Sequence, residues 1–202
     1  MRPRPHDLLR LDDWHAAIRA DTPPWVAESL AATPWVVVRR SVARPGGIPV
    51  GVRGPSRSHR HAMALPSYCV AETITPQMLS SDLPESRFLP PFDAVRAVAL
   101  RLRGTELRWG PTGSVGFELA TGSPCVSPDS DLDLAVYLDS AADTAGLHAL
   151  QSVMEHIPCR IDCQLEFSWG AVALADLASG SPTVLAKCPD GPRLVETAAL
   201  TS

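Results

Sequence analysis

The sequence predicts an α+β protein with a mixed β-sheet and two domains of unequal size. Two alternating strand patterns, at residues 131–138 and 160–167, flank an amphipathic helix pattern. Residues 82–91 are proline-rich and aperiodic, as expected of a linker. Hydrophobic residues make up 45% of the 202 and charged residues 20%, as in ordinary globular proteins. We therefore expect a smaller N-terminal α/β domain over residues 1–85 and a larger domain over residues 86–202.

The first domain is predicted to contain a short helix followed by two strands. Residues 23–32 begin with two prolines, which favour the first turn of a helix. Residues 35–40 are rich in valine and favour a strand, and residues 48–53 favour a second strand after a Pro-Gly-Gly turn. Proline cannot donate a hydrogen bond to a neighbouring strand, so Pro49 indicates that the second strand lies at a sheet edge.

The second domain is predicted to begin with two helices. A helix is expected from about Phe92 to Arg103, with Gly104 at its end. Residues 109–121 contain three glycines and then an apolar run, which indicates a turn that leads into a short helix.

The strand at 131–138 is the clearest in the sequence, because its leucines alternate with Asp131 and Asp133. Ser140 and Asp143 have capping-box spacing, so a helix is expected there, ending before Pro158. The next strand, at 160–167, directs Ile161, Cys163, Leu165 and Phe167 inward, and directs outward the polar residues Asp162, Gln164 and Glu166. A short strand at 171–174 and a hairpin that joins 183–188 to 193–195 complete the domain.

The two aspartates of the first strand are candidate metal ligands. Side chains two residues apart on a strand point the same way, so Asp131 and Asp133 can converge on one cation. Their mutual repulsion favours binding of a divalent ion, and Mg²⁺ prefers carboxylate and phosphate oxygens. Asp162 is the expected third ligand and could help to remove a proton from the attacking hydroxyl, with Glu166 as the alternative. A lone Asp-x-Asp also occurs at exposed strand ends without any catalytic role.

The turn Gly113-Ser114 is a candidate phosphate site, because it precedes a helix and offers backbone N–H groups and a hydroxyl. It is not a Walker A loop, since the only lysine is Lys187. It is not a nucleophile elbow either, because Thr112 stands where that motif requires glycine.

The arginines gather in the first domain, although the net charge is −4. No Asp or Glu occurs from Ser29 to Ala71. A solvated surface and a polyanion-binding surface are both compatible with this pattern, and the complete lack of acids favours the second. Arginine is also suited to bidentate phosphate contacts. The arginines of this stretch are Arg39, Arg40, Arg44, Arg53, Arg57 and Arg60.

Nothing in the sequence predicts a membrane or secreted protein. It has no apolar run of about 18 residues and no signal-peptide core, so a cytoplasmic protein is expected. The five cysteines include no Cys-x-x-Cys pair. Reduced, mostly buried thiols are therefore favoured over a zinc site.

Gly113-Ser114, Asp131-x-Asp133 and a third acid together resemble the nucleotidyltransferase superfamily of DNA polymerase beta and the aminoglycoside nucleotidyltransferases. Residues 109–122 and 130–134 further resemble one branch, the malonate decarboxylase holo-acyl-carrier-protein synthases, also called phosphoribosyl-dephospho-CoA transferases. The resemblance covers nearly the whole chain and includes residues 4–9, 48–58 and 191–195.

The resemblance implies a polymerase-beta-like core over 86–202, with Asp131 and Asp133 as catalytic aspartates. It also implies transfer from 2'-(5''-triphosphoribosyl)-3'-dephospho-CoA to a serine of the apo acyl carrier protein of malonate decarboxylase. Neither nucleic acid nor a membrane is an expected partner. Such a substrate and an acidic carrier both call for arginines, so we expect Arg53, Arg57 and Arg60 to contact phosphates or the carrier.

Two other functions stay open at this point. One is an ATP-dependent adenylyltransferase that acts on a small molecule or protein. The other is a non-catalytic module that binds a carrier protein. The presence of all three acids, Asp131, Asp133 and Asp162, favours an enzyme over the second alternative.

Overall fold

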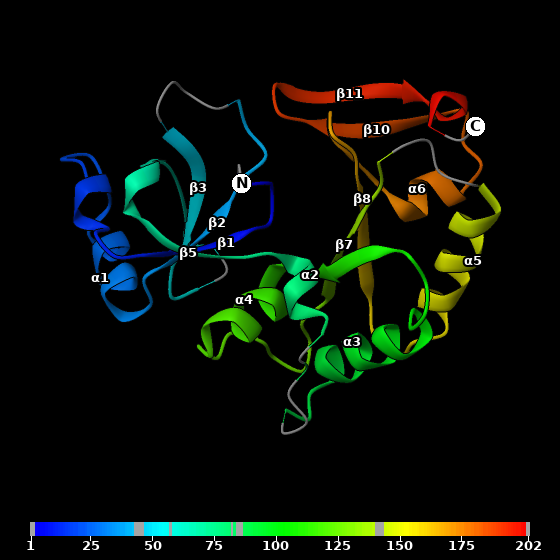
Figure 1. Cartoon of the computed structure of the whole chain (residues 1–202), viewed down its shortest axis with the longest axis horizontal. Coiled ribbons are helices and arrows are strands. Elements are labelled where there is room, and N and C mark those ends of the chain that lie inside the picture. The colour runs from blue at the N-terminus through cyan, green and yellow to red at the C-terminus, as the bar shows by residue number, and fades with distance from the viewer. Residues whose placement is uncertain are drawn as a thin grey trace. The chain divides into compact units, whose positions relative to one another are not determined.

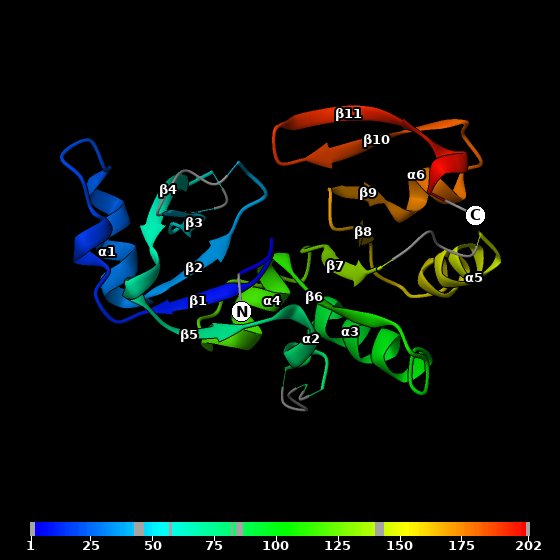
Figure 2. The same cartoon turned by 45° about the horizontal axis from the view of Figure 1, so that its top comes forward.

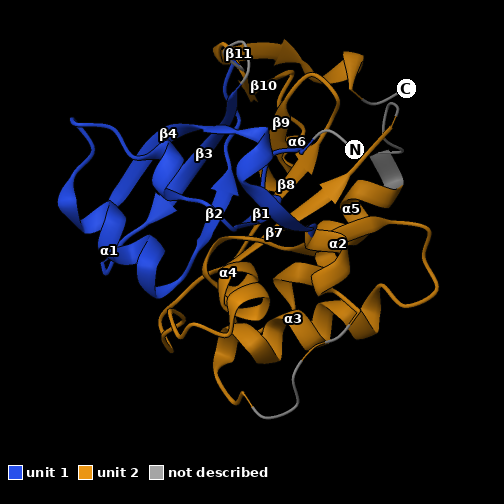
Figure 3. Cartoon of the chain, turned by 60° about the vertical axis from the view of Figure 1, so that its left-hand side comes forward, with its two compact units in different colours: residues 1–75 blue, residues 76–202 orange. Residues whose placement is uncertain are grey.

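The computed structural model describes residues 3–42, 47–56, 58–81, 83, 87–139 and 144–200. The chain forms two compact units, residues 1–75 and residues 76–202, each built around its own hydrophobic core (Figure 3). The boundary expected from sequence, between residues 85 and 86, lies further along the chain than this division.

Unit 1 is a five-stranded antiparallel sheet in the order β4-β3-β2-β1-β5, with a helix of nine residues, α1 (Figure 1). Because neighbouring strands all run antiparallel, the expected α/β class is wrong for this unit, which is α+β. The elements are β1 (Leu8–Leu11), α1 (Pro24–Ala32), β2 (Trp35–Val38), β3 (Gly47–Arg53), β4 (Arg60–Pro66) and β5 (Val70–Ile74), with short 3-10 turns at His15–Ala17 and Ser67–Cys69.

The edge position expected for the strand that contains Pro49 is wrong, because β3 lies between β4 and β2. The β2–β3 ladder has only two paired positions, Val37 with Gly51 and Val38 with Val50. The carbonyl of Pro49 then accepts a hydrogen bond from the Arg39 amide just beyond this ladder, at 2.8 Å. The missing N–H of proline thus falls where the pairing stops, which is why an interior strand tolerates it.

Unit 2 contains a six-stranded mixed sheet in the order β11-β10-β9-β8-β7-β6, which confirms the predicted mixed sheet. The β7–β8 pair is parallel and the other neighbours are antiparallel. Figure 2 shows β9, β10 and β11 side by side. The strands are β6 (Arg108–Pro111), β7 (Leu132–Tyr137), β8 (Ile161–Glu166), β9 (Ala171–Ala173), β10 (Thr183–Cys188) and β11 (Gly191–Glu196).

Four helices of unit 2, α3, α4, α5 and α6, supply buried residues to the same core as the sheet. Leu132 and Leu134 of β7 and Leu165 of β8 are almost fully buried in it. Each such leucine contributes about 1.5–3 kcal/mol through burial of its side chain. The helices are α2 (Pro76–Leu79), α3 (Pro90–Arg101), α4 (Gly113–Thr121), α5 (Thr144–Glu155) and α6 (Leu174–Ala178), with a 3-10 turn at Thr197–Ala199.

Several features of unit 2 differ from the sequence-based expectation. A strand, β6, precedes α4 where only a turn was expected, and the short helix α6 was not expected. Glu166 is buried although the alternation placed it among outward-facing polar residues. The predicted cap formed by Ser140 and Asp143 lies outside the described residues.

Within the described ranges, no helix is long and apolar enough to cross a membrane.

Candidate active site

Asp133 and Asp162 lie side by side on the two parallel strands of unit 2. They are register partners in the β7–β8 ladder. Register partners on neighbouring strands are about 5 Å apart and present their side chains on the same face. That face is opposite to the one on which Leu132 and Leu134 enter the core. The structure therefore brings together two of the three acids predicted as metal ligands.

Asp131 precedes β7 by one residue and is partly buried, with 28% of its side chain exposed. Its Oδ2 lies 3.8 Å from Nη1 of Arg160, the residue that precedes β8. The Arg160 carbonyl accepts a hydrogen bond from the Leu132 amide at 2.9 Å, so the starts of the two strands are tied together. Because the Arg160 side chain is 81% exposed, solvent screens this ion pair and leaves Asp131 available to a stronger cation.

The geometry favours Asp162 over Glu166 as the third acid. Asp162 is exposed, and its Oδ1 accepts a hydrogen bond from the Gln164 side-chain amide at 2.7 Å. Glu166 is 5% exposed and pairs in register with Tyr137. It also lies four residues beyond Asp162, or about 13 Å along the strand. A single ion held by Asp133 and Asp162 is therefore out of reach of Glu166.

Helix α4 begins directly against the Asp133 carboxylate. Gly113, its first residue, has a left-handed φ of +58°, and a Cβ there would overlap the carboxylate of Asp133. The amide of Thr112 donates a hydrogen bond to the Asp133 carbonyl at 2.8 Å. The Thr112 side chain makes no capping hydrogen bond, and the first amides of a helix have no acceptor within the helix. The predicted Gly113-Ser114 site and the Asp133 carboxylate therefore form one continuous surface.

Cys163 lies on β8 directly after Asp162, but on the buried face. Burial raises the pKa of its thiol far above the ordinary range, and the nearby charges of Asp162 and Glu166 add to this effect. Cys163 is therefore a neutral thiol at physiological pH and a poor metal ligand. Among the residues that the structure describes, no group of three or more His, Cys, Asp or Glu side chains is gathered closely enough to hold a metal ion.

The predicted arginines belong to unit 1. Arg53 and Arg60 are register partners where β3 ends and β4 begins, next to the segment that connects the two strands. Arg57, which lies between them in sequence, is outside the described residues. His59, which directly precedes Arg60, shares a 2.5 Å hydrogen bond with the Ser56 hydroxyl and packs edge-on against Trp25.

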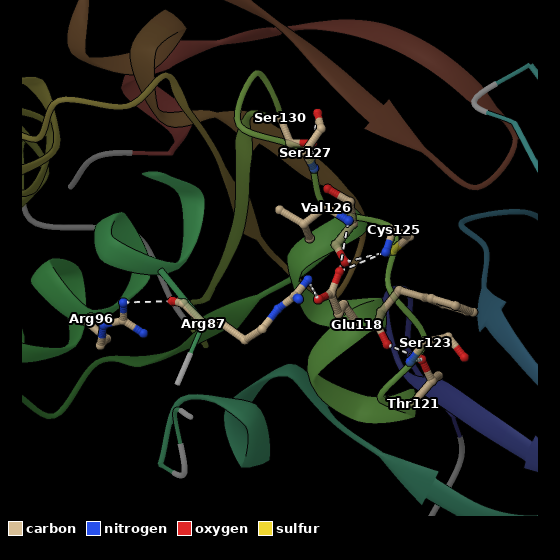
Figure 4. Close-up of polar contacts among 11 residues, drawn as sticks. Arg87, Arg96, Glu118, Thr121, Ser123, Cys125, Val126, Ser127 and Ser130 are labelled. Carbon is tan, nitrogen blue, oxygen red and sulfur yellow. Dashed lines mark hydrogen bonds and ion pairs between the residues drawn. The ribbon is translucent and has the colours of Figure 1, made fainter. Parts of the chain in front are cut away.

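A polar network around Glu118, in α4, was not foreseen from the sequence (Figure 4). Glu118 is 6% exposed, and its carboxylate accepts hydrogen bonds from the side chain of Arg87 and from the amides of Cys125 and Val126. The available signal was an acid within an otherwise apolar helical run, Val115-Gly116-Phe117-Glu118-Leu119. An acid in such a run is buried and needs partners from elsewhere in the chain.

Comparison with known proteins identifies a single family along nearly the whole chain. Residues 4–76 match the family model described as phosphoribosyl-dephospho-CoA transferase MdcG N-terminal domain, and residues 78–198 match that of the C-terminal domain. A phosphoribosyl-dephospho-CoA transferase from Azotobacter vinelandii is 40% identical over 203 residues, which cover 96% of this chain and 92% of the relative.

Relatives with the same name show similar agreement. The protein from Pseudomonas aeruginosa is 40% identical over 195 residues, covering 96% of this chain and 92% of the relative. The protein from Klebsiella pneumoniae strain 342 is 40% identical over 200 residues, covering 96% and 95%. No solved structure matches the chain.

Proposed function

The chain belongs to the phosphoribosyl-dephospho-CoA transferase family and is a transferase, and we propose that it modifies the apo acyl carrier protein of malonate decarboxylase. The proposed donor is 2'-(5''-triphosphoribosyl)-3'-dephospho-CoA and the proposed acceptor is a serine of the carrier. The observation that supports the location of this chemistry is the contact of the Gly113 backbone with the Asp133 carboxylate, beside Asp162.

In the proposed reaction, the serine hydroxyl oxygen attacks the α-phosphorus of the donor. A phosphodiester bond forms, the bond from the α-phosphorus to the bridging oxygen of the β-phosphate breaks, and pyrophosphate leaves. The first amides of α4, beginning at Gly113 and Ser114, would bind the leaving phosphates, because they point out of the helix at its positive end. Asp162, which is exposed, would accept the proton of the attacking hydroxyl.

Asp131, Asp133 and Asp162 are the residues that would hold Mg²⁺. They fit the ion in ligand type, although they do not form a ready-made three-ligand cluster, because Mg²⁺ is usually bound by one or two carboxylates together with substrate phosphates. Two of them are register partners, and the third lies two residues along from Asp133. When bound, Mg²⁺ would neutralise the negative charge on the phosphate oxygens. Without it, Asp133 and Asp162 would repel both each other and the donor.

Three further assignments belong to this proposal. Unit 2 would be a polymerase-beta-like catalytic core, which its mixed sheet and the placement of α4 beside β7 support. Unit 1 would bind the substrate or the carrier through Arg53, Arg57 and Arg60. The protein would work in the cytoplasm. All five cysteines lie in described parts of the chain and none forms a disulfide, which supports a reducing compartment.

The decisive experiment compares Asp133→Ala with the wild-type protein, using purified apo carrier, synthetic donor and Mg²⁺. We expect the rate of pyrophosphate release to fall about 100-fold or more, because the variant lacks the central carboxylate. Asp176→Ala is the matched control, since Asp176 is an exposed aspartate in the first turn of α6.

Mass spectrometry of the carrier then identifies the group transferred. A phosphoribosyl-dephospho-CoA adduct on serine supports the proposal, whereas an AMP adduct formed with ATP would identify an adenylyltransferase instead. Wild-type release rates in the Asp133→Ala protein would contradict the assignment of the site.

A further inference from the structure

The chain leaves the proposed site along α4 and must return to it before β7 begins. Residues 115–130 separate Ser114 from Asp131, yet the Thr112 amide bonds to the Asp133 carbonyl at 2.8 Å. A helix of nine residues advances about 13 Å, so the loop at 122–131 has to run back over a similar distance. The Sγ of Cys125 donates to the Ser114 carbonyl at 3.4 Å, which places the returning loop against the first turn of α4.

The returning loop is held by one buried side chain, that of Glu118. Its Oε2 accepts hydrogen bonds from the consecutive amides of Cys125 and Val126, at 2.7 and 2.8 Å. Its Oε1 accepts a hydrogen bond from the guanidinium of Arg87. Charge-assisted bonds of this kind are the strong ones in a protein interior, and removal of one partner leaves the others buried without compensation. Figure 4 shows the Glu118 carboxylate between the Arg87 guanidinium and the two loop amides.

Arg87 is itself fixed near the start of α3. Its carbonyl accepts a hydrogen bond from Arg96 at 3.0 Å, and its guanidinium lies 5.6 Å from the centre of the Phe92 ring. Two α3 residues therefore hold Arg87, Arg96 at its carbonyl and Phe92 at its guanidinium. The pair connects α3 and α4 to the loop through a single carboxylate.

The remaining residues before Asp131 form a closed turn. The Ser127 amide donates to Ser130 Oγ at 3.0 Å, and the Ser130 amide donates to the Ser127 carbonyl at 3.1 Å. The turn starts directly after Val126 and ends directly before Asp131. Asp131 is thus held from two sides, by β7, which begins at Leu132, and by the turn that Glu118 anchors at Val126.

We infer that Glu118 is a positioning residue of the active site: it holds the returning loop against Ser114 and anchors the turn that leads into Asp131. This inference rests on the proposed function, since it assigns Asp131 a part in the transfer. Glu118 itself is not one of the groups proposed to react. It acts through the amides of Cys125 and Val126.

The test is Glu118→Gln in the full chain, with two measurements. The substitution preserves size and one acceptor oxygen, but it removes the charge and directs an N–H donor at either Arg87 or the loop amides. We expect kcat for carrier modification to fall about 10–100-fold, because displacement of a reacting group by about 1 Å has effects of that size. The KM for the carrier should not change. By NMR, exchange of the Cys125 and Val126 amides should accelerate while that of the β7 amides does not.

Two further variants keep the test decisive. Glu118→Asp retains the charge on a shorter side chain and should give a kcat between those of Glu118→Gln and the wild type. If the Glu118→Gln protein does not fold, Glu118→Asp still tests the inference. Leu177→Ala, in the buried face of α6, lowers the melting temperature without touching the loop and should leave kcat at the wild-type value.

The possible outcomes separate this inference from the proposed function. A wild-type protein without transferase activity would refute the function, and the exchange rates would still report whether Glu118 holds the loop. An active wild type whose Glu118 variants keep the wild-type kcat would overturn the inference. So would an equal loss of kcat in Leu177→Ala, because the effect would then follow from stability alone.

Discussion

Two separate constraints, its backbone conformation and the crowding by a neighbouring side chain, restrict the residue at position 113 to glycine. Its φ of +58° is a region that non-glycine residues enter at a cost of about 1–2 kcal/mol. A Cβ would also overlap the Asp133 carboxylate, so any side chain must displace that group. Glycine at this position is therefore required both by the turn and by the aspartate behind it.

Gly113→Ala should lower both stability and transferase activity. We expect the free energy of unfolding to fall by about 1–2 kcal/mol and kcat to fall by at least about tenfold, because Asp133 is displaced. Gly180→Ala is the matched control, since Gly180 has a φ of +74° and no atom within 4 Å of its Cβ position. It should lose comparable stability and keep its activity. Equal activity losses in the two variants would contradict a role for the Gly113–Asp133 contact.

Asp7, in unit 1, is a second residue whose burial has a measurable effect, on the pH dependence of stability. It is 2% exposed and its Oδ2 accepts a hydrogen bond from the Arg4 amide at 2.8 Å. Burial raises the pKa of Asp7 above its ordinary value of 3.8, and the hydrogen bond only partly offsets this. The folded state therefore binds the proton more tightly than the unfolded state, so Asp7 lowers stability as pH rises from 3.8 through the folded pKa.

Asp7→Asn should remove this pH dependence while its amide oxygen still accepts the Arg4 amide. The melting temperature of the variant relative to the wild type should increase between about pH 4 and about pH 7. Thermal denaturation at the two pH values measures the difference. A constant difference would mean that the two folded proteins titrate alike and that Asp7 is not the cause.

At the scale of elements, β6 shows how a strand depends on a neighbour that the local sequence does not reveal. Gly110, in the middle of β6, lies so close to the Pro76 carbonyl of α2 that a Cβ would overlap it. Arg108-Trp-Gly-Pro has little strand propensity, and an interior glycine weakens a strand. Pairing with β7 and the close approach of α2 decide its structure.

Gly110→Ala should therefore destabilise unit 2. Overpacking against a backbone atom costs about 1–3 kcal/mol, which thermal or chemical denaturation would measure. Gly51→Ala is the comparison, because Gly51 is also a strand glycine but its Cβ position meets chiefly the flexible stem of Arg39. Gly51→Ala should change the unfolding free energy much less. A similar loss in both variants would point to strand propensity and not to the α2 contact.

For the whole molecule, the charge distribution divides the proposed work between the units. The acids Asp131, Asp133 and Asp162 belong to unit 2, and the acid-free stretch with Arg53, Arg57 and Arg60 belongs to unit 1. Substitution of these three arginines by alanine should raise the KM for the triphosphate donor or for the carrier by about tenfold or more, because each charge-assisted contact is worth about 1.5–3 kcal/mol.

A control with the same change of charge replaces Arg101, Arg103 and Arg193, all on unit 2, by alanine. Steady-state kinetics with each substrate varied in turn measures both constants. Unchanged KM values for donor and carrier in the first triple variant would exclude Arg53, Arg57 and Arg60 as contacts. Equal increases in both triple variants would indicate a general effect of net charge.

The sequence by itself determined the features that depend on local periodicity. Leucines that alternate with aspartates predict β7 and its two faces, and the same alternation predicts β8 with Asp162 in phase. Two prolines predict the start of α1. Gly113-Ser114 and the aspartates also carry the family resemblance. Matches to relatives along nearly the whole chain confirmed this resemblance.

Only the tertiary structure decided which of these residues meet. Parallel pairing of β7 with β8 makes Asp133 and Asp162 neighbours. The loop that Glu118 holds brings the chain back toward Ser114 although many residues separate Ser114 from Asp131. Packing within unit 2 buries Glu166, and strand pairing within unit 1 places Pro49 in an interior strand. The physical reason is that burial, register and close backbone approach depend on segments distant in sequence, whereas alternation and turn formation depend on neighbouring residues.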